Sequence, residues 1–195
     1  MINYFKQKNK KRSGFTLVET LVAISVFSVS IIALMAALGK GISDTNQVKY
    51  KMTATSLAEE GIEYIRNMRD TFVLYDDVSD ATVGWGDFVT KLTQCAGGCK
   101  FDDTLARYDI DKLKNMTFSS CTANICALDY DSTSHKYLYH QLGTLSGFTR
   151  VITANPVNPA NTKGEIKITS TVSWVKNSAT YSVSFSDNLL KWRGE

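Results

Sequence analysis

The sequence predicts an α+β protein in which one long N-terminal α-helix packs on a C-terminal antiparallel β-sheet. Two observations predict this fold class. The run from Phe15 to Leu38 holds 24 residues that are apolar or small except for one acid, and helix-forming residues without proline continue the run to about Asp70. From residue 148 onward, apolar and polar residues alternate with a period of two, which is typical of strands with one buried face.

The first fourteen residues carry five basic side chains and no acidic one. These are Lys6, Lys8, Lys10, Lys11 and Arg12. Removing these five from the 22 basic residues of the chain leaves 17 against 19 acidic residues. The positive net charge therefore reflects this leader, and the sequence argues against a nucleic-acid-binding surface.

The apolar segment from Phe15 to Leu38 is long enough to cross a membrane, because about 20 helical residues span the hydrocarbon core. The basic leader predicts that the N-terminus stays in the cytoplasm and that the chain beyond Leu38 lies outside. One alternative is a cleaved secretory signal peptide, but its apolar region would be roughly 7–15 residues long. The other alternative is a plain membrane anchor, which leaves Glu19 unexplained.

Glu19 is the one ionisable residue between Phe15 and Leu38. A carboxylate in apolar surroundings is tolerated when a cation pairs with it. Cleavage between Gly14 and Phe15 would supply that cation, because the new amino terminus would lie four residues, or one helical turn, from Glu19. The positive end of the helix dipole also favours a carboxylate at this position.

The segment GFTLVE (residues 14–19), with a basic leader before it and an apolar helix after it, resembles the type III signal of type IV prepilins and type II secretion pseudopilins. The resemblance implies that a membrane prepilin peptidase cuts after Gly14 and N-methylates Phe15. It also implies that Glu19 pairs with the terminal amine of a neighbouring subunit during assembly with other pilin or pseudopilin subunits. The apolar helix would then leave the bilayer and enter the core of a filament.

The helix is expected to continue through residues 39–70 with one buried face, because apolar residues from Ala58 to Met68 recur at spacings of three and four. Gly39 and Gly41 either permit a bend or simply mark the membrane exit, since each glycine weakens a helix by about 1 kcal/mol. The resemblance implies the same arrangement, the "ladle" of pilins, in which this half of the helix covers the sheet.

Four segments carry the strand pattern: residues 148–154, 165–175, 180–186 and, more weakly, 136–142. In the second of these, Ile166, Ile168, Val172 and Trp174 fall on one face. We expect antiparallel strands with one wet face, and we expect the amphipathic half of the long helix to cover the dry one.

Four cysteines lie in the middle of the chain, at Cys95, Cys99, Cys121 and Cys126. Cysteines outside the cytoplasmic membrane are expected to form disulfides. The pairing stays open, because four cysteines allow three connectivities: local pairs would close small loops, whereas crossed pairs would join distant parts of this region. A zinc site is the alternative, but structural zinc favours tighter spacings than these.

The remaining candidate ligands are two histidines, His135 and His140, and five loop acids. The acids are Asp76, Asp77, Asp80, Asp129 and Asp131. The histidine spacing places the two rings on opposite faces of a strand, and the acids lack the glycine and distal glutamate of an EF-hand loop. With no nucleotide-binding, esterase or metalloprotease motif present either, we predict no enzymatic activity, no cofactor and no bound metal.

The resemblance favours a structural subunit of a type IV pilus or related pseudopilus, and the long middle region favours a minor subunit. The alternatives are a DNA-uptake (competence) pseudopilin that binds DNA and a surface adhesin presented on the filament. The chain would first span the cytoplasmic membrane once and then lie in an extracellular or periplasmic filament. Five regions are expected: a cleaved leader (1–14), a membrane and filament-core helix (15–38), its amphipathic continuation (39–70), an acidic cysteine-containing region (71–147), and strands with a C-terminal tail (148–195).

Overall fold

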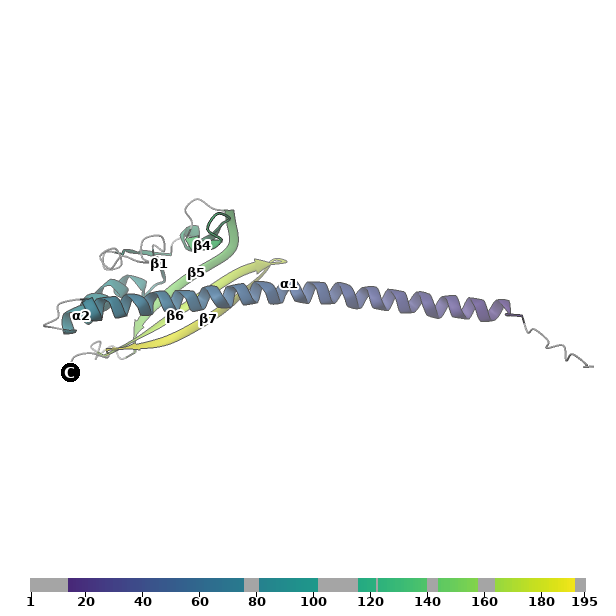
Figure 1. The fold of residues 1–195 in the computed structure, drawn as a ribbon, viewed down its shortest axis with the longest axis horizontal. Helices are drawn as coiled ribbons and strands as arrows, with labels where there is room; N and C mark the ends of the chain where they lie inside the picture. The colour runs from purple at the N-terminus through teal and green to yellow at the C-terminus, as the bar shows by residue number, and fades with distance from the viewer. Residues whose placement is uncertain are drawn as a thin grey trace, which may run out of the picture. The chain divides into compact units, whose positions relative to one another are not determined.

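The computed structural model describes residues 14–75, 81–101, 116–121, 123–139, 144–157 and 164–191. In chain order the elements are α1 (Leu17–Tyr75), α2 (Ala81–Leu92), the 3₁₀ turn η1 (Thr93–Cys95), β1 (Cys99–Phe101), β2 (Phe118–Ser120), the 3₁₀ turn η2 (Ala123–Cys126), β3 (Ala127–Asp131), β4 (Lys136–Tyr139), β5 (Thr144–Pro156), β6 (Glu165–Lys176) and β7 (Ala179–Leu190). This is the expected α+β fold, with one long helix and an antiparallel sheet (Figure 1). By its internal contacts the chain divides into two units, residues 1–48 and 49–195.

The backbone of α1 stays helical through both glycines at which the sequence allowed a bend. The Thr45 hydroxyl donates to the Gly41 carbonyl at 2.8 Å, which is an ordinary helix-surface contact. The helix also runs past its expected end at Asp70, because Phe72 and Val73 are buried in the core and hold its last turns in place.

In the first unit, the helical residues up to Val48 are exposed in the single chain. Three serine hydroxyls in the apolar part are nevertheless satisfied: Ser25, Ser28 and Ser30 each donate to a backbone carbonyl three or four residues earlier, at 2.8 Å. Because each hydroxyl bonds within its own helix, these serines bring no unsatisfied donor into lipid or into a filament core.

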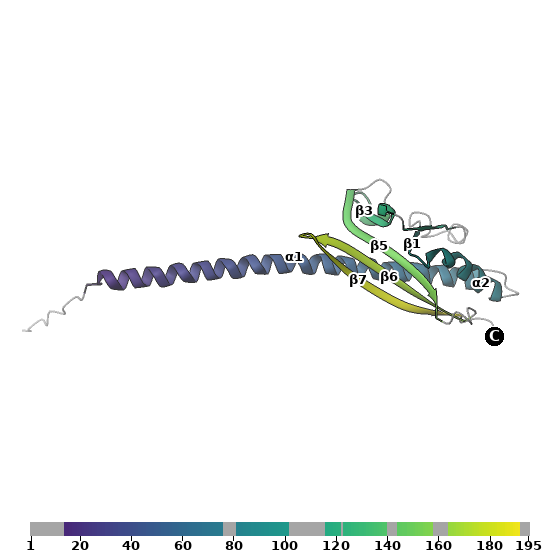
Figure 2. The same cartoon turned by 180° about the vertical axis from the view of Figure 1, so that it is seen from behind.

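The second unit is built around β5, whose two edges pair with different strands (Figure 2). One edge pairs with β6 over nine residues, and β6 in turn pairs with β7 over twelve. The other edge pairs first with β3 and then, at Ile152, with β1. The strands expected at 148–154, 165–175 and 180–186 therefore lie side by side in one sheet, within the longer strands β5, β6 and β7.

The β6–β7 hairpin closes through a two-residue turn, Asn177 and Ser178. Their φ angles are +51° and +62°. Two consecutive positive φ angles are the signature of the tight turns that match the twist of an antiparallel hairpin. Asn177 suits such a turn because asparagine tolerates the left-handed conformation better than most residues do.

The inner face of the sheet is apolar, as the alternation predicts: Ile166, Ile168, Val172 and Trp174 are all buried. On the outer face, hydroxyl side chains pair across the strands. Thr169 lies 2.8 Å from Ser186, and Thr171 lies 2.9 Å from Ser184, counted between the hydroxyl oxygens. Such cross-strand pairs stabilise the wet face of the sheet.

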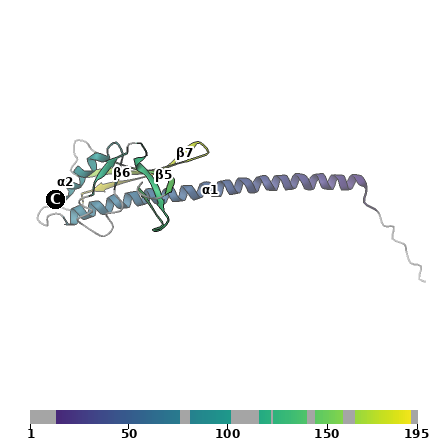
Figure 3. The same cartoon turned by 90° about the horizontal axis from the view of Figure 1, so that it is seen from above.

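The second half of α1 packs on this inner face (Figure 3). It comes close to the sheet at Gly61. A Cβ atom at Gly61 would lie 2.5 Å from the Ser170 Oγ and 2.9 Å from the Ile152 Cδ1. Both opposing side chains belong to the middle of the sheet. Helix and sheet can therefore pack this tightly because residue 61 has no side chain.

Arg150 is the largest fully buried side chain, and it lies between the helix and the sheet. Its Nε donates to the Tyr139 hydroxyl at 3.0 Å. Its Nη1 donates to the Leu57 carbonyl at 3.4 Å and to Glu60 Oε2 at 3.2 Å. The guanidinium carbon also lies 5.0 Å from the ring centre of Phe101 and 4.7 Å from that of Tyr139. One cation thus joins α1 to three strands.

Nearer the end of α1, Arg66 makes a second ionic contact between helix and sheet. Its Nη2 lies 2.8 Å from the Asp187 Oδ2 of β7. Arg66 also pairs with Glu63 on its own helix. The hydrogen bond to Asp187 is the main cause of a raised pKa at Arg66. This pair is partly exposed, so we expect it to contribute little stability compared with the buried Arg150 contacts.

We expect Gly61→Ala to lower the free energy of unfolding by about 1–3 kcal/mol, because the new methyl group overpacks the helix–sheet contact. Urea unfolding of the full chain in detergent measures this. Gly86→Ala is the matched control: it also adds a methyl group inside a helix, but nothing lies within 4 Å of its Cβ. Equal stability of the two variants would contradict the tight packing at Gly61.

Candidate cleavage and assembly site at the start of α1

The three residues before α1, Gly14, Phe15 and Thr16, have no regular secondary structure and are exposed. The side chain of Phe15 is 76% exposed. The peptide bond between Gly14 and Phe15 therefore lies outside the helix, where a peptidase does not have to unwind a helical turn to reach it.

Thr16 is the residue that caps the helix. Its side-chain oxygen accepts a hydrogen bond from the Glu19 amide at 3.3 Å, and its carbonyl accepts bonds from the Glu19 and Thr20 amides at 3.1 and 3.2 Å. Threonine at the N-cap with glutamate three residues later is the sequence pattern of a capping box, and the bond from the Glu19 amide to the Thr16 side chain is the half of it that the structure shows. Our sequence analysis did not single out Thr16, although the T-x-x-E pattern before an apolar run is a readable signal for it.

Glu19 thus occupies the first turn of α1, near the positive end of the helix dipole. The helix that it begins is long and apolar enough to cross a membrane, by length and composition. The hydroxyl groups of Ser25, Ser28 and Ser30 already have hydrogen-bond partners in this segment. The carboxylate of Glu19 is therefore the group for which a partner has to be found.

A comparison with protein-family models matches residues 9–35 to the prokaryotic N-terminal methylation motif. The chain carries the type IV prepilin signal. This signal spans the end of the leader, the Gly14–Phe15 bond and the apolar first part of α1. No curated protein and no solved structure matches the chain.

The prepilin signal supports a pilin or pseudopilin rather than an enzyme. It implies processing by a prepilin peptidase and assembly with other pilins. Together with the apolar helix, it fits a protein that is first anchored in a membrane and later built into a filament. The rest of the chain, from residue 36 onward, lies outside the matched region, and its fold is known from the structure alone.

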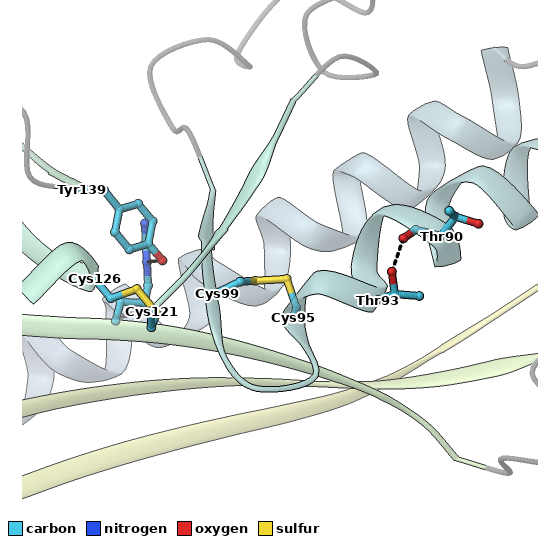
Figure 4. The surroundings of a disulfide bond; sticks show 8 residues. Thr90, Thr93, Cys95, Cys99, Cys121, Cys126 and Tyr139 are labelled. Atoms are coloured by element: carbon cyan, nitrogen blue, oxygen red, sulfur yellow. Dashed lines mark hydrogen bonds between the residues drawn. A yellow bond between two sulfur atoms is a disulfide. The ribbon is translucent and has the colours of Figure 1, made fainter. Parts of the chain in front are cut away.

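The four cysteines form two local disulfides, Cys95–Cys99 and Cys121–Cys126. Figure 4 shows the first bridge at the turn between η1 and β1, close to the second. Cys99 starts β1, and Cys121 directly follows β2, whose Ser120 pairs with Cys99. The connectivity that the sequence left open is therefore the local one. Backbone pairing between β1 and β2, rather than a crossed disulfide, joins the two loops.

The remaining candidate ligands that the structure describes are Asp129, Asp131 and His135. Asp129 is buried in β3, whereas Asp131 accepts hydrogen bonds from the Thr133 and Ser134 amides and the Ser134 hydroxyl. The Ser134 bond is the main cause of a lowered pKa at Asp131. His135 is exposed in the same turn. Among the described residues, no three His, Cys, Asp or Glu side chains lie close enough to hold a metal ion.

Several candidates from the sequence fall outside the described residues. These are Asp76, Asp77, Asp80 and His140, together with the five basic residues of the leader.

We expect Thr16→Ala to loosen the first turn of α1, because loss of an N-cap costs about 1 kcal/mol. Amide hydrogen exchange of Glu19 and Thr20, whose amides donate to Thr16, measures this in detergent micelles as an increase of about fivefold in rate. Thr20→Ala is the matched control, since its hydroxyl bonds only to the Leu17 carbonyl at 2.8 Å and caps no amide. Unchanged exchange in Thr16→Ala would contradict the capping role.

The local disulfides predict a simple peptide map. Trypsin cuts after Lys91 and Lys100, so the non-reduced digest should contain the peptide 92–100 with its own internal bridge, lighter than the reduced peptide by two hydrogen atoms. Mass spectrometry of the non-reduced chain checks this. A species joining peptide 92–100 to the peptide that carries Cys121 would instead indicate crossed pairing.

Proposed function

We propose that this chain is a structural subunit of a type IV pilus or a related pseudopilus. In this proposal a prepilin peptidase cuts after Gly14 and methylates Phe15, and the mature chain assembles through α1 and Glu19. The observation that carries the proposal is the coincidence of the prepilin signal with the start of one long apolar helix whose first turn holds a single carboxylate.

The local geometry supports cleavage after Gly14. The bond lies two residues before the first residue of α1, in an exposed part of the chain. The cut would leave Phe15 as the new terminus and Thr16 in place, so the capping box that starts the helix would survive processing. The mature chain would therefore keep a defined helix start with a free amine immediately before it.

Glu19 supports the assembly step. In the bilayer or in a filament core, an unpaired carboxylate costs several kcal/mol, and pairing with a cation offsets that cost. The terminal amine that cleavage creates is such a cation, and in a filament a neighbouring subunit brings another copy of it. Pairing of Glu19 with the neighbour's amine would favour helices that are packed together over single helices in lipid.

The position in the membrane follows the same reasoning. The basic leader would stay in the cytoplasm by the positive-inside bias, and residues 49–195 would lie on the other side. The two disulfides of this second unit agree with an oxidising compartment. A minor rather than major position in the filament, DNA uptake and adhesion stay predictions, which the relative abundance of subunits and binding assays with the purified protein would test.

We expect Glu19→Ala to leave cleavage intact and to reduce incorporation into filaments, because the peptidase acts on the exposed bond before the helix while assembly requires the carboxylate. N-terminal sequencing and mass spectrometry should find methylated Phe15 in both wild type and variant. Quantification of the chain in the sheared filament fraction should show a loss of about tenfold or more, as expected for an ion pair in apolar surroundings.

Ser25→Ala is the matched control in the same helix, since its hydroxyl bonds only to the Val22 carbonyl. It should assemble as wild type does. A mature chain that still begins with Met1 would contradict the whole proposal, whereas normal assembly of Glu19→Ala would contradict the pairing step alone.

A further inference from the structure

The strand β7 forms one edge of the sheet, on the far side of β6 from β5 (Figure 2). Among the described residues it pairs with β6 alone, over all twelve of its positions and without a bulge. The other two edge strands, β2 and β4, have three and four residues. In an antiparallel pair, alternate residues turn their backbone N–H and C=O groups away from the partner, so β7 offers a long regular row of these groups to a further strand.

β7 lacks the features by which edge strands usually avoid pairing. Its sequence, ATYSVSFSDNLL, contains no proline, no glycine and no basic residue. Its one charged side chain, Asp187, already binds Arg66 of α1. Natural edge strands are typically short, bent or charged, because a long regular edge pairs with any strand that fits it. The absence of these features from β7 indicates that this edge has a partner.

The inner face of β7 is also incompletely covered. Tyr181, Val183 and Phe185 are partly buried, whereas the residues opposite them on β6 are buried. The core therefore becomes thinner toward this edge. One more strand, with apolar side chains at alternate positions, would cover the exposed sides of these three residues.

The order of side chains along β7 indicates which strand fits. From Thr180 to Ser186 the sequence TYSVSFS reads nearly alike in both directions: hydroxyl, aromatic, serine, valine, serine, aromatic, hydroxyl. A strand with this symmetry about Val183 is complementary to an antiparallel copy of itself. Among the described strands, the others of this length are β5 and β6, and both already pair on two sides.

The antiparallel register centred on Val183 brings similar side chains together. The opposing residues are Val183 with Val183, Tyr181 with Phe185, Ser182 with Ser184, Thr180 with Ser186, and Ala179 with Asp187. The valine and aromatic pairs fall on the inner face, and the hydroxyl pairs fall on the outer face. Cross-strand pairs of these kinds stabilise a sheet, and the acid at position 187 meets no like charge.

We infer that β7 pairs antiparallel with β7 of a second copy of this chain, with Val183 opposite Val183, so that two sheets become one continuous sheet. Both chains contribute the same edge, and the contact therefore closes as a unit of two chains.

This contact fixes the relative direction of the two chains. β7 starts near Tyr50, because Ala179 pairs with Lys176 and the Lys176 amine lies 5.7 Å from the centre of the Tyr50 ring. It ends near Arg66, which binds Asp187. β7 thus runs in the same direction as the second half of α1, and an antiparallel β7 pair turns the two helix halves in opposite directions. Under the proposed function the subunits of one filament point the same way, so the pair would join subunits of two oppositely directed filaments.

Paired charge variants of the full chain in detergent test the contact. Ser182→Lys combined with Ser184→Lys places lysine opposite lysine at both serine pairs and should weaken self-association by about tenfold. The double variant with glutamate at both positions should do the same. A mixture of the two variants should associate again, because each lysine then faces a glutamate. Analytical ultracentrifugation over a range of protein concentrations measures the association.

The matched control carries the same two lysines one strand further in, as Thr171→Lys with Ser173→Lys. These β6 residues lie directly opposite Ser184 and Ser182, so the charges stay at the same level of the outer face but leave the edge. This control should associate as wild type does. If wild type is monomeric, if control and edge variants associate equally, or if the lysine and glutamate variants do not associate when mixed, the inference is wrong.

A cysteine at the centre of the pair tests the register. Val183→Cys places two thiols opposite each other, and mild oxidation should join two chains through position 183, as mass spectrometry of the non-reduced dimer would show. Ser186→Cys is the control on the same strand, because its counterpart would lie six residues away along the pair, roughly 20 Å. Equal cross-linking at the two positions would contradict the register centred on Val183.

Sheared filaments test the placement between filaments, which is the part of the inference that rests on the proposed function. Filaments that carry the lysine variant and filaments that carry the glutamate variant should each stay single in electron micrographs, and their mixture should associate side by side. If the purified chain pairs through β7 but the mixed filaments stay single, the placement between filaments is wrong and the β7 contact stands. If the leader is retained and the chain is absent from filaments, the proposed function is wrong, and the measurements on the purified chain still decide the β7 contact.

Discussion

The packing of the second unit depends on one buried cation. Arg150 projects from the central strand β5 into the contact between helix and sheet, where it is 1% exposed. A guanidinium group is costly to bury, so each partner that stabilises it there also constrains the element that supplies that partner.

The partners of Arg150 come from several elements. Tyr139 comes from β4, Leu57 and Glu60 come from α1, and the ring of Phe101 from β1 lies beside the guanidinium group. Since these partners lie in fixed directions, Arg150 specifies where the second half of α1 lies on the sheet more sharply than apolar contacts alone would do. Gly61, one residue after Glu60, then lets the backbone of the helix come close to the middle of the sheet.

The first part of α1 and the part from Lys49 onward carry side chains that suit different environments. Up to Val48 its side chains are exposed in the single chain, and from Leu17 to Leu38 they are apolar or small apart from Glu19, which suits lipid or other helices. From Lys49 onward one side is buried on the sheet, and the helix also carries both basic and acidic residues, of which Arg66 pairs with Glu63. Glu19 at the start of the helix is the carboxylate for which we propose a partner in another subunit, whereas Glu60 binds Arg150 within the chain. The Glu19 contact would act between chains, which is how a chain with little of its helix buried would be stabilised in a filament.

Much of this fold could be predicted from local patterns in the sequence. The apolar run after Gly14, the glutamate in its first turn and the period-two strands all follow from short-range sequence signals, and the inner-face residues of β6 were predicted correctly. Three features of the structure were not predicted from the sequence. Arg150 lies at an inward position of β5, between Phe148 and Ile152, but the sequence analysis did not single it out, because its partners come from segments far away in the sequence. The end of α1 was placed too early, because Phe72 and Val73 are held helical by tertiary packing. Thr16 was missed although its capping pattern is local.

The sequence by itself determined the features at the start of the chain: a basic leader, the prepilin signal and an apolar helix with one acid, because charge and the length of an apolar run are local properties. It also determined which faces of the long strands are buried, since alternation requires no knowledge of the partner. Only the tertiary structure decided how the cysteines pair, because the choice among three connectivities depends on where the backbone brings them. It likewise decided that the carboxylate of Glu60 faces a cleft on one side and Arg150 on the other, because that arrangement needs α1, β4 and β5 to meet at one point.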